Sequence, residues 1–325
     1  MEIRMIKQVF LVVLGLSLMA SAAGQQLPQF SQYIFNSLHI NPAYAGYKVD
    51  PFVQATYRSQ YVGFPGAPRT FSLNADMGTL DESMGFGVSL LSDQLGPTKI
   101  QSAMLTYAYR VKTGTNSFLG LGISAGTSEY VLDGSVLQPD DPTDTTLPEG
   151  RLNTFTPNLN TGLFYHSPRF FTGLSVFNLI GKRRLEKEDI ALAMHNYHFY
   201  FQMGGLVFLS DEVEFKPSFL IREDLKSPTN YDINAMFLFY DQFSTGLSYR
   251  SSLNKNHNQH DSLNQINRKA LAAIMDILVT NNLRVGYAYD FNLNKQHNYR
   301  NNSHEISVGY YLSDKWINGT GNRNF

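Results

Sequence analysis

The feature that most constrains the fold of this chain is a two-residue alternation of apolar side chains with small or polar ones. In residues 243–250, for example, Phe243, Leu247 and Tyr249 alternate with residues such as Gly246. A period of two residues is typical of a β-strand with two chemically different faces. About fourteen segments show this pattern, at residues 52–58, 69–78, 84–91, 100–111, 118–126, 155–166, 170–178, 197–209, 212–222, 231–240, 243–250, 269–279, 283–290 and 304–312.

The chemistry of the two faces favours a membrane barrel over a soluble sandwich. The face opposite the apolar one is crowded with Gly, Ser and Asn, as in a wet lumen, rather than with the Lys and Glu of a soluble surface. The chain has 23 Phe and 19 Tyr, yet its mean hydropathy is only -0.23. Aromatic residues near strand ends suit a membrane-interface girdle: Tyr57, Tyr107, Tyr109, Tyr197, Phe199, Tyr249, Tyr289 and Tyr310. The sequence therefore predicts an all-β, transmembrane antiparallel β-barrel of about 14 strands.

The connections between these segments alternate in length, which gives the barrel a direction. Short polar turns are predicted at 167–168, 210–211, 241–242 and 281–282, and long loops at 127–154, 179–196, 251–268 and 291–303. The first four connections run long, short, medium and short. Outer-membrane barrels place short turns in the periplasm and long loops outside. This phase predicts that both termini are periplasmic.

The two ends of the chain extend beyond the strand pattern. Arg4 and Lys7 precede an apolar run from Val9 to Ala20, which predicts a cleaved signal peptide at residues 1–24. The barrel itself is expected at 51–313 and a periplasmic tail at 314–325. The chain has no Cys, so neither a lipoprotein anchor nor a disulfide can be formed.

Residues 25–50 form a pre-barrel segment that fits no lipid-facing strand. A barrel of fourteen strands is wider than its own side chains can fill, so its interior either conducts or is plugged. The segment carries Phe30, Tyr33, Phe35 and Tyr44, which argue against a disordered tail. It is therefore predicted to lie in the lumen or at the periplasmic mouth.

No motif in the chain indicates catalysis. There is no nucleophile elbow, zinc-protease helix, phosphate loop or dinucleotide fingerprint, and most of the eight His residues fall in loops. The acidic loop at 140–144 does not match a calcium-binding spacing and is interrupted by Pro142, and the mixed-charge loop at 182–189 is expected to be solvated rather than to bind lipopolysaccharide. A formal net charge of -1 argues against a nucleic-acid surface. We expect no enzyme activity, cofactor, metal or nucleic acid.

Several blocks in the first third of the chain resemble a known family. Residues 29–33 (QFSQY) and 41–46 (NPAYAG) are similar to the opening signature of the PorP/SprF family of type IX secretion system membrane proteins. The blocks at 57–68 (YRSQYVGFPGAP), 93–97 (DQLGP) and 107–110 (YAYR) resemble those that follow in the family. Tyr61 stands where the family would have Trp. Beyond Gly126, only the barrel pattern and the length are similar.

The resemblance implies an outer-membrane component of the type IX secretion and gliding machinery. Its partners would be outer-membrane lipid, apparatus proteins of the periplasmic ring or the peptidoglycan, and secreted cargo with a C-terminal signal domain. The alternative is a porin or substrate-selective transporter, although the charges on the predicted inner faces look scattered rather than arranged in opposed rings. These charged residues are Asp76, Arg110, Asp232, Arg250, Asp276, Arg284 and Asp290. The candidate contacts to a partner or plug are Phe30, Tyr33, Asn41, Pro42, Tyr44, Gly46, Arg58, Tyr61, Phe64, Pro65 and Pro68. The alternative role for the turn at 41–46 and the loop at 61–68 is simply to close one rim of the barrel.

Overall fold

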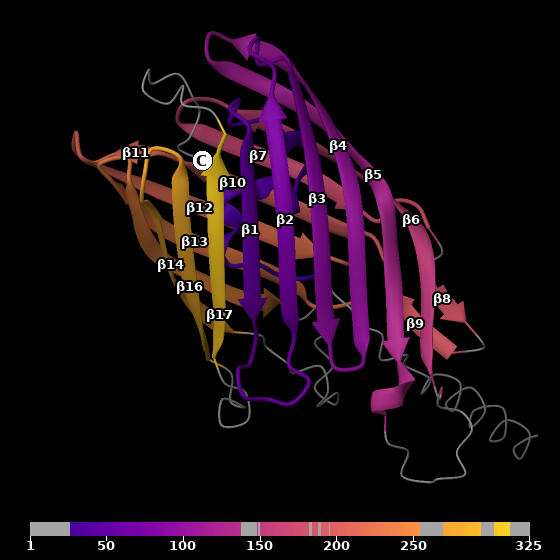
Figure 1. Ribbon diagram of the computed structural model, residues 1–325. Helices are drawn as coiled ribbons and strands as arrows, with labels where there is room; N and C mark the ends of the chain where they lie inside the picture. Colours follow the sequence, from indigo (N-terminus) through magenta and orange to yellow (C-terminus); the bar gives the residue numbers. More distant parts are fainter. Residues whose placement is uncertain are drawn as a thin grey trace, which may run out of the picture.

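A computed structural model describes residues 27–137, 148, 150–181, 184–187, 190–194, 196–253, 269–293 and 302–312. Fourteen antiparallel strands form a closed barrel (Figure 1). They are β1 (Phe52–Ser59), β2 (Arg69–Gly78), β3 (Met84–Leu95), β4 (Thr98–Gly114), β5 (Ser117–Asp133), β6 (Arg151–His166), β7 (Phe170–Phe177), β10 (His198–Gly205), β12 (Val213–Glu223), β13 (Thr229–Phe239), β14 (Phe243–Leu253), β15 (Ala270–Leu278), β16 (Leu283–Asn292) and β17 (Ser303–Tyr311).

Two sets of pairings close the sheet. The first strand, β1, pairs with the last, β17, and β10 pairs with both β7 and β12. A short strand, β11 (Val207–Phe208), continues β10 past Leu206 and also pairs with β12. A separate hairpin of β8 (Arg184–Lys187) and β9 (Ile190–Met194) lies beside β6 and β5. Each of the fourteen predicted segments coincides with one barrel strand, so the predicted fold class is confirmed.

Two predicted connections are wrong in length, both at the loop end of β3 to β6. The expected medium connection at 92–99 is a two-residue turn at Gly96 and Pro97, where Gly96 has φ +54°. The expected loop at 127–154 is shorter too, because β5 continues to Asp133 and β6 begins at Arg151. Here the hydrogen-bonded ladder continues past the apolar alternation, since polar residues face outward once a strand leaves the hydrocarbon. A strand predicted from hydropathy alternation alone therefore ends too early.

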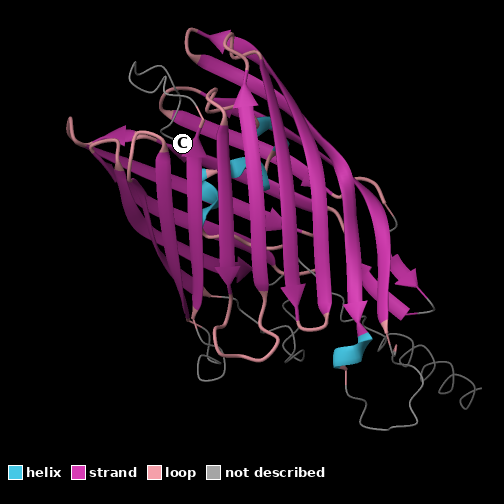
Figure 2. Ribbon diagram, in the orientation of Figure 1, coloured by secondary structure: helices cyan, strands magenta, loops and turns pink. Residues whose placement is uncertain are grey.

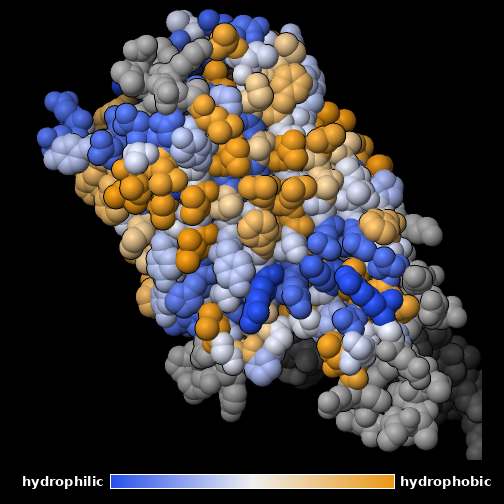
Figure 3. Space-filling view, in the orientation of Figure 1, coloured by the Kyte–Doolittle hydropathy of each residue, from blue (hydrophilic) through white to orange (hydrophobic). Residues whose placement is uncertain are grey.

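The strand register puts small and polar side chains inside the barrel. In β1, Gln54, Thr56 and Arg58 are buried in the lumen, while Val53 and Tyr57 face outward. On the face shown in Figure 3, apolar residues collect in a belt across the barrel wall, with hydrophilic residues on either side of it. This arrangement matches the predicted polarity of the two faces. Within the described ranges, no helix has the length and apolarity to cross a bilayer.

The strand ends that flank the predicted short turns and those that flank the predicted long loops lie at opposite ends of the barrel, and the turn at Gly96 and Pro97 is a short turn at the loop end. The last strand ends beside the start of the first, where the Leu312 amide donates to the Pro51 carbonyl at 2.9 Å. Both strands therefore begin or end at the short-turn end, which is uppermost in Figure 1. This confirms the predicted phase, and the assignment of that end to the periplasm stays a prediction. The predicted signal peptide and C-terminal tail lie outside the described residues.

The pre-barrel segment lies inside the lumen as three short 3-10 turns. They are η1 (Gln32–Phe35), η2 (Ser37–His39) and η3 (Pro42–Tyr44), visible as helices within the barrel in Figure 2. The Asn36 side chain accepts a hydrogen bond from the Leu38 amide, and Asn41 accepts one from Ala43. Such local caps favour short turns over a long helix. We call residues 27–50 the plug.

Candidate functional site: the plug and the barrel wall

The carboxylate of Glu305, on β17, is the main anchor of the plug. It accepts hydrogen bonds from the backbone amides of Ser31 and Gln32, each at 2.8 Å. Arg58 Nη1, on β1, donates to the same carboxylate at 2.8 Å. Glu305 is fully buried, so its charge depends on these three donors for stabilisation.

Glu305 belongs to a belt of alternating charges on one side of the lumen. Arg58 pairs with Asp290, and Arg250 lies 3.8 Å from Asp290 and 3.0 Å from Asp232. Arg222 extends the belt, 2.6 Å from Asp232. Three positive and three negative residues therefore neutralise one another on adjacent inner faces: Arg58, Arg222, Arg250, Asp232, Asp290 and Glu305. We call these six residues the charge belt.

The charge belt corrects the expectation of scattered inner charges. Sequence reasoning identified Arg58, Asp232, Arg250 and Asp290, but not as one network, and it missed Glu305 and Arg222. One sequence feature could have identified Glu305, because it is the only acidic residue on the inner face of the last strand. Its pairing with Arg58, however, depends on the closure of β17 onto β1.

Polar groups of the plug complete the charge belt. Ser31 Oγ donates to Asp290 at 2.8 Å and accepts from Arg58 at 3.1 Å. Tyr33 Oη accepts a hydrogen bond from Asn234 at 2.7 Å, and burial raises the pKa of Tyr33 well above its ordinary value. The phenol therefore stays protonated. The plug is held by specific hydrogen bonds as well as by its bulk.

The NPAYAG turn, residues 41–46, contacts the opposite wall. Asn41 Nδ2 donates to the Leu163 carbonyl at 2.8 Å, and the Gly46 amide donates to Asp76 at 2.8 Å. Arg110 Nη1 donates to the Gly46 carbonyl at 2.6 Å. Gly46 has φ +69°, and a Cβ there would lie 2.6 Å from the Met77 carbonyl oxygen. Only glycine fits this position.

Glycines of the wall make room for this turn. A Cβ on Gly122 of β5 would clash with the backbone of Ala43, and one on Gly85 of β3 would clash with the carbonyl of Ala45. The sequence indicated these glycines as small lumen residues. In the folded chain they are contact points where two backbones meet.

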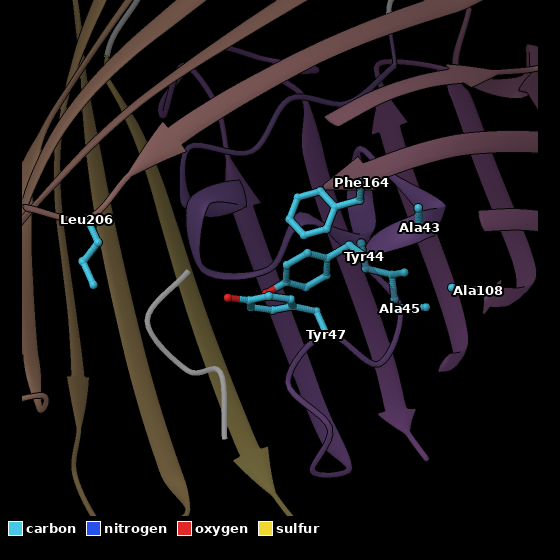
Figure 4. Packing of buried hydrophobic residues seen from close by; sticks show 8 residues of the cluster. Ala43, Tyr44, Ala45, Tyr47, Ala108, Phe164 and Leu206 are labelled. Atoms are coloured by element: carbon cyan, nitrogen blue, oxygen red, sulfur yellow. The ribbon is translucent and has the colours of Figure 1, made fainter. Parts of the chain in front are cut away.

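Aromatic side chains pack the plug against β6. The Tyr44 ring lies 5.5 Å from that of Phe164, and Tyr47 lies 5.7 Å from Phe164 and 4.7 Å from His166, each in edge-to-face geometry. Tyr44 is only 1% exposed, and Pro42 beside it is buried. Figure 4 shows the rings of Tyr44, Tyr47 and Phe164 gathered close together. Sequence reasoning identified Tyr44 but missed Tyr47.

A small cavity remains between the plug and the wall toward the loop end. Its volume is about 130 Å³, and Phe30, His39, Tyr130 and Asn158 are among its lining residues. His39 stacks on Phe30 at 4.5 Å between ring centroids and hydrogen-bonds to Asn74 at 2.8 Å. Burial lowers the pKa of His39 to about 4, so the ring is neutral at physiological pH.

Four of the candidate residues lie away from the plug. Tyr61, Phe64, Pro65 and Pro68 belong to the β1–β2 connection at the loop end of the barrel. The Tyr61 amide donates to Ser303 Oγ at 3.3 Å, and Phe64 is 58% exposed. A contact of these four residues with the plug stays a prediction. A role in binding a partner stays a prediction.

Within the part of the chain that the structure describes, no group of three or more His, Cys, Asp or Glu residues is placed to hold a metal ion. The acidic loop at 140–144 lies outside the described residues. Of the mixed-charge loop at 182–189, only the backbone of 184–187 is described.

The sequence of the chain matches an established family profile over nearly its whole length. The profile of the type IX secretion system membrane protein PorP/SprF covers residues 22–310. The chain belongs to the PorP/SprF family. This span includes the plug and almost all of the barrel, so both are parts of the family's common chain. No curated protein sequence is significantly similar to this PorP/SprF chain.

Three solved structures that are similar to this PorP/SprF chain share little of its sequence. The crystal structure of a Pseudomonas aeruginosa FadL homologue has 13% identity and a TM-score of 0.47, with 90% of this chain and 97% of that one covered. The CymD monoaromatic hydrocarbon channel has 11% identity and a TM-score of 0.49, covering 86% and 93%. Acinetobacter baumannii Omp33 has 8% identity and a TM-score of 0.44, covering 82% and 100%. At these values the likeness says nothing about ligands.

Proposed function

We propose that this chain is a non-enzymatic outer-membrane barrel of the type IX secretion and gliding machinery that works by binding other proteins. After export by a cleaved signal peptide, it would bind apparatus proteins on its periplasmic side and cargo with a C-terminal signal domain. The observation that carries the proposal is the occupied lumen, in which Glu305 receives the plug amides of Ser31 and Gln32. A barrel filled by its own chain offers its two ends, rather than its interior, to a partner.

The energetics of the plug support a stable closure. Releasing the plug would remove two of the three donors to the Glu305 carboxylate and leave water in their place. A hydrogen bond to a charged group typically contributes about 1.5–3 kcal/mol. The aromatic contacts of Tyr44 and Tyr47 add burial on the opposite side. Spontaneous opening is therefore expected to be rare.

Photo-crosslinking in the native envelope tests the proposed partners. A photoreactive residue at Phe64, in the exposed loop-end connection, is expected to capture cargo with a C-terminal signal domain. The matched control is Leu105, which is 68% exposed on the lipid-facing wall and should capture no such cargo. Failure to capture this cargo from Phe64, or equal capture from Leu105, would contradict the proposal.

A channel is the second candidate function, and the cavity beside the plug favours it. Its lining combines the aromatic side chains of Phe30 and Tyr130 with polar groups such as Asn158. A path for a small solute could have such a lining. Single-channel recording of the intact chain and of a variant lacking residues 27–50 separates the two functions. A partner-binding barrel should be silent when intact and conduct when the plug is absent. Large steady currents from the intact protein would favour the channel.

A further inference from the structure

A pocket of about 550 Å³ opens at the short-turn end, where β11 leads into β12 and β13 turns into β14. Figure 1 shows β11 at one upper corner of the barrel. The plug contributes nothing to its lining. The pocket is lined by Phe208, Leu209, Ser210, Asp211, Glu212, Glu214, Leu238 and Asp241.

Four of these eight residues are acidic, and their charge is not neutralised by ion pairs. None of the ion pairs found among the described residues involves Asp211, Glu212, Glu214 or Asp241. Glu212 accepts a hydrogen bond from the Tyr240 hydroxyl at 2.8 Å, which leaves its charge in place. The pocket therefore presents a local negative potential to anything that approaches this end.

Glu214 shows that the pocket is incomplete as it stands. The residue is 9% exposed and faces the pocket from the inner side of β12. Its Oε2 atom has no hydrogen-bond partner among the described residues. Two bases lie in the same region: Arg169 lies over the Phe208 ring, 5.4 Å from its centroid, and Lys216 lies one position further in on the same strand face. Neither forms an ion pair with an acid of the pocket among the described residues. A buried carboxylate oxygen without a donor is costly and calls for a cationic group.

Exposed apolar side chains lie beside the acids. Phe208 and Leu209 are 53% and 57% exposed and border the pocket. A ligand that satisfies both features has positive charges and at least one apolar side chain. Anionic lipid headgroups and nucleic acid would be repelled by the four carboxylates, and no metal-binding group of residues is found in the described chain. A basic protein segment is the remaining class.

We propose that this acidic pocket binds a basic, apolar-tipped segment of a periplasmic partner protein. A Lys or Arg side chain of the partner occupies the space beside Glu214, and an apolar side chain packs on Phe208 and Leu209. The inference rests on the proposed function, because it takes the short-turn end as periplasmic and the barrel as a partner-binding component. It adds the position and the chemistry of that contact.

A peptide of alternating Lys and Leu tests the chemistry with the full-length barrel in nanodiscs. The double variant D211N/D241N removes two exposed charges without removing any hydrogen bond described above. It should weaken peptide binding about tenfold, equivalent to about 1.4 kcal/mol, and flatten the salt dependence. The single variant E214Q should also weaken it. The matched control is D81N/E82Q, two acids on the β2–β3 turn at the same end, which should change binding less than twofold. Equal weakening of peptide binding by both double variants would contradict the proposal that the peptide binds in this pocket.

Crosslinking identifies the natural partner and separates this inference from the proposed function. A photoreactive residue at Leu209 should capture, in the native envelope, a segment rich in Lys and Arg, and D211N/D241N should abolish that capture. A captured segment without excess basic residues, or capture unchanged in D211N/D241N, would overturn the inference. If the captured basic segment belongs to a protein outside the secretion apparatus, the pocket stands and the proposed function fails.

Discussion

The two sides of the lumen hold the plug by different means. On the side formed by β12 to β17 and β1, buried charges bind polar atoms of the plug, with Glu305 at the centre. On the side formed by β2 to β7, the NPAYAG turn packs closely against the backbone of glycine residues and against aromatic rings. The first side depends on a balance of charge. The second depends mainly on the absence of side-chain atoms, and Asp76 and Arg110 also bind Gly46 there. They should therefore respond to different perturbations.

The largest expected effect is on the charged side. Arg58→Ala leaves Asp290 and Glu305 without their shared donor and should destabilise plug docking by about 3–5 kcal/mol. Hydrogen exchange of residues 30–36 measures this as lost amide protection. Arg69→Ala, an exposed arginine on the neighbouring strand, is the control and should leave protection unchanged. Equal protection in both variants would show that the charge belt does not hold the plug.

A smaller effect is expected on the packed side. Gly122→Ala places a methyl group against the backbone of Ala43 and should cost about 1–3 kcal/mol of docking energy, as overpacking does. Protease cleavage within the plug measures the change. Gly150→Ala is the control, because nothing lies within 4 Å of a Cβ at that position. If Gly122→Ala resists protease as well as the control does, the close-packing explanation is wrong.

Acid should loosen the plug through His39, which borders the cavity on the packed side. The docked ring has a pKa lowered to about 4, whereas a released ring titrates near 6.5. As pH falls below about 6.5, His39 is protonated in the released state but stays neutral in the docked state. Docking therefore weakens until pH 4 is reached. We expect a loss of about 1–2 kcal/mol between pH 7 and pH 5. Plug protection measured at both values in wild type and His39→Asn, which should not show this pH dependence, checks the assignment.

The smallest effect concerns a single neutral hydrogen bond on the charged side. Tyr33→Phe removes the acceptor of the Asn234 amide and should cost about 0.5–1.5 kcal/mol. The change in amide protection of residues 30–36 should therefore be well below that of Arg58→Ala. A loss as large as that of Arg58→Ala would mean that the hydroxyl, rather than the charges, dominates this side.

The sequence by itself determined the barrel, because its signals are local. Alternation along residues 243–250 is a property of a single extended chain, and the polar turn at 241–242 marks where that chain reverses. These local signals predicted the fourteen strands, their inward faces and the common end of the first and last strands. The aromatic residues of the plug, Phe30 and Tyr44 among them, were also sufficient to predict a segment in or near the lumen.

Only the tertiary structure decided which residues meet. Glu305 and Arg58 are 247 positions apart, and they are neighbours because the closed barrel sets β17 beside β1 in one register. The same closure determines that Gly122 faces Ala43 and that Glu214 opens toward the acidic turns. A strand's own periodicity says which face a side chain takes, but not which partner stands across the lumen. The curvature and the register of the whole barrel determine that partner.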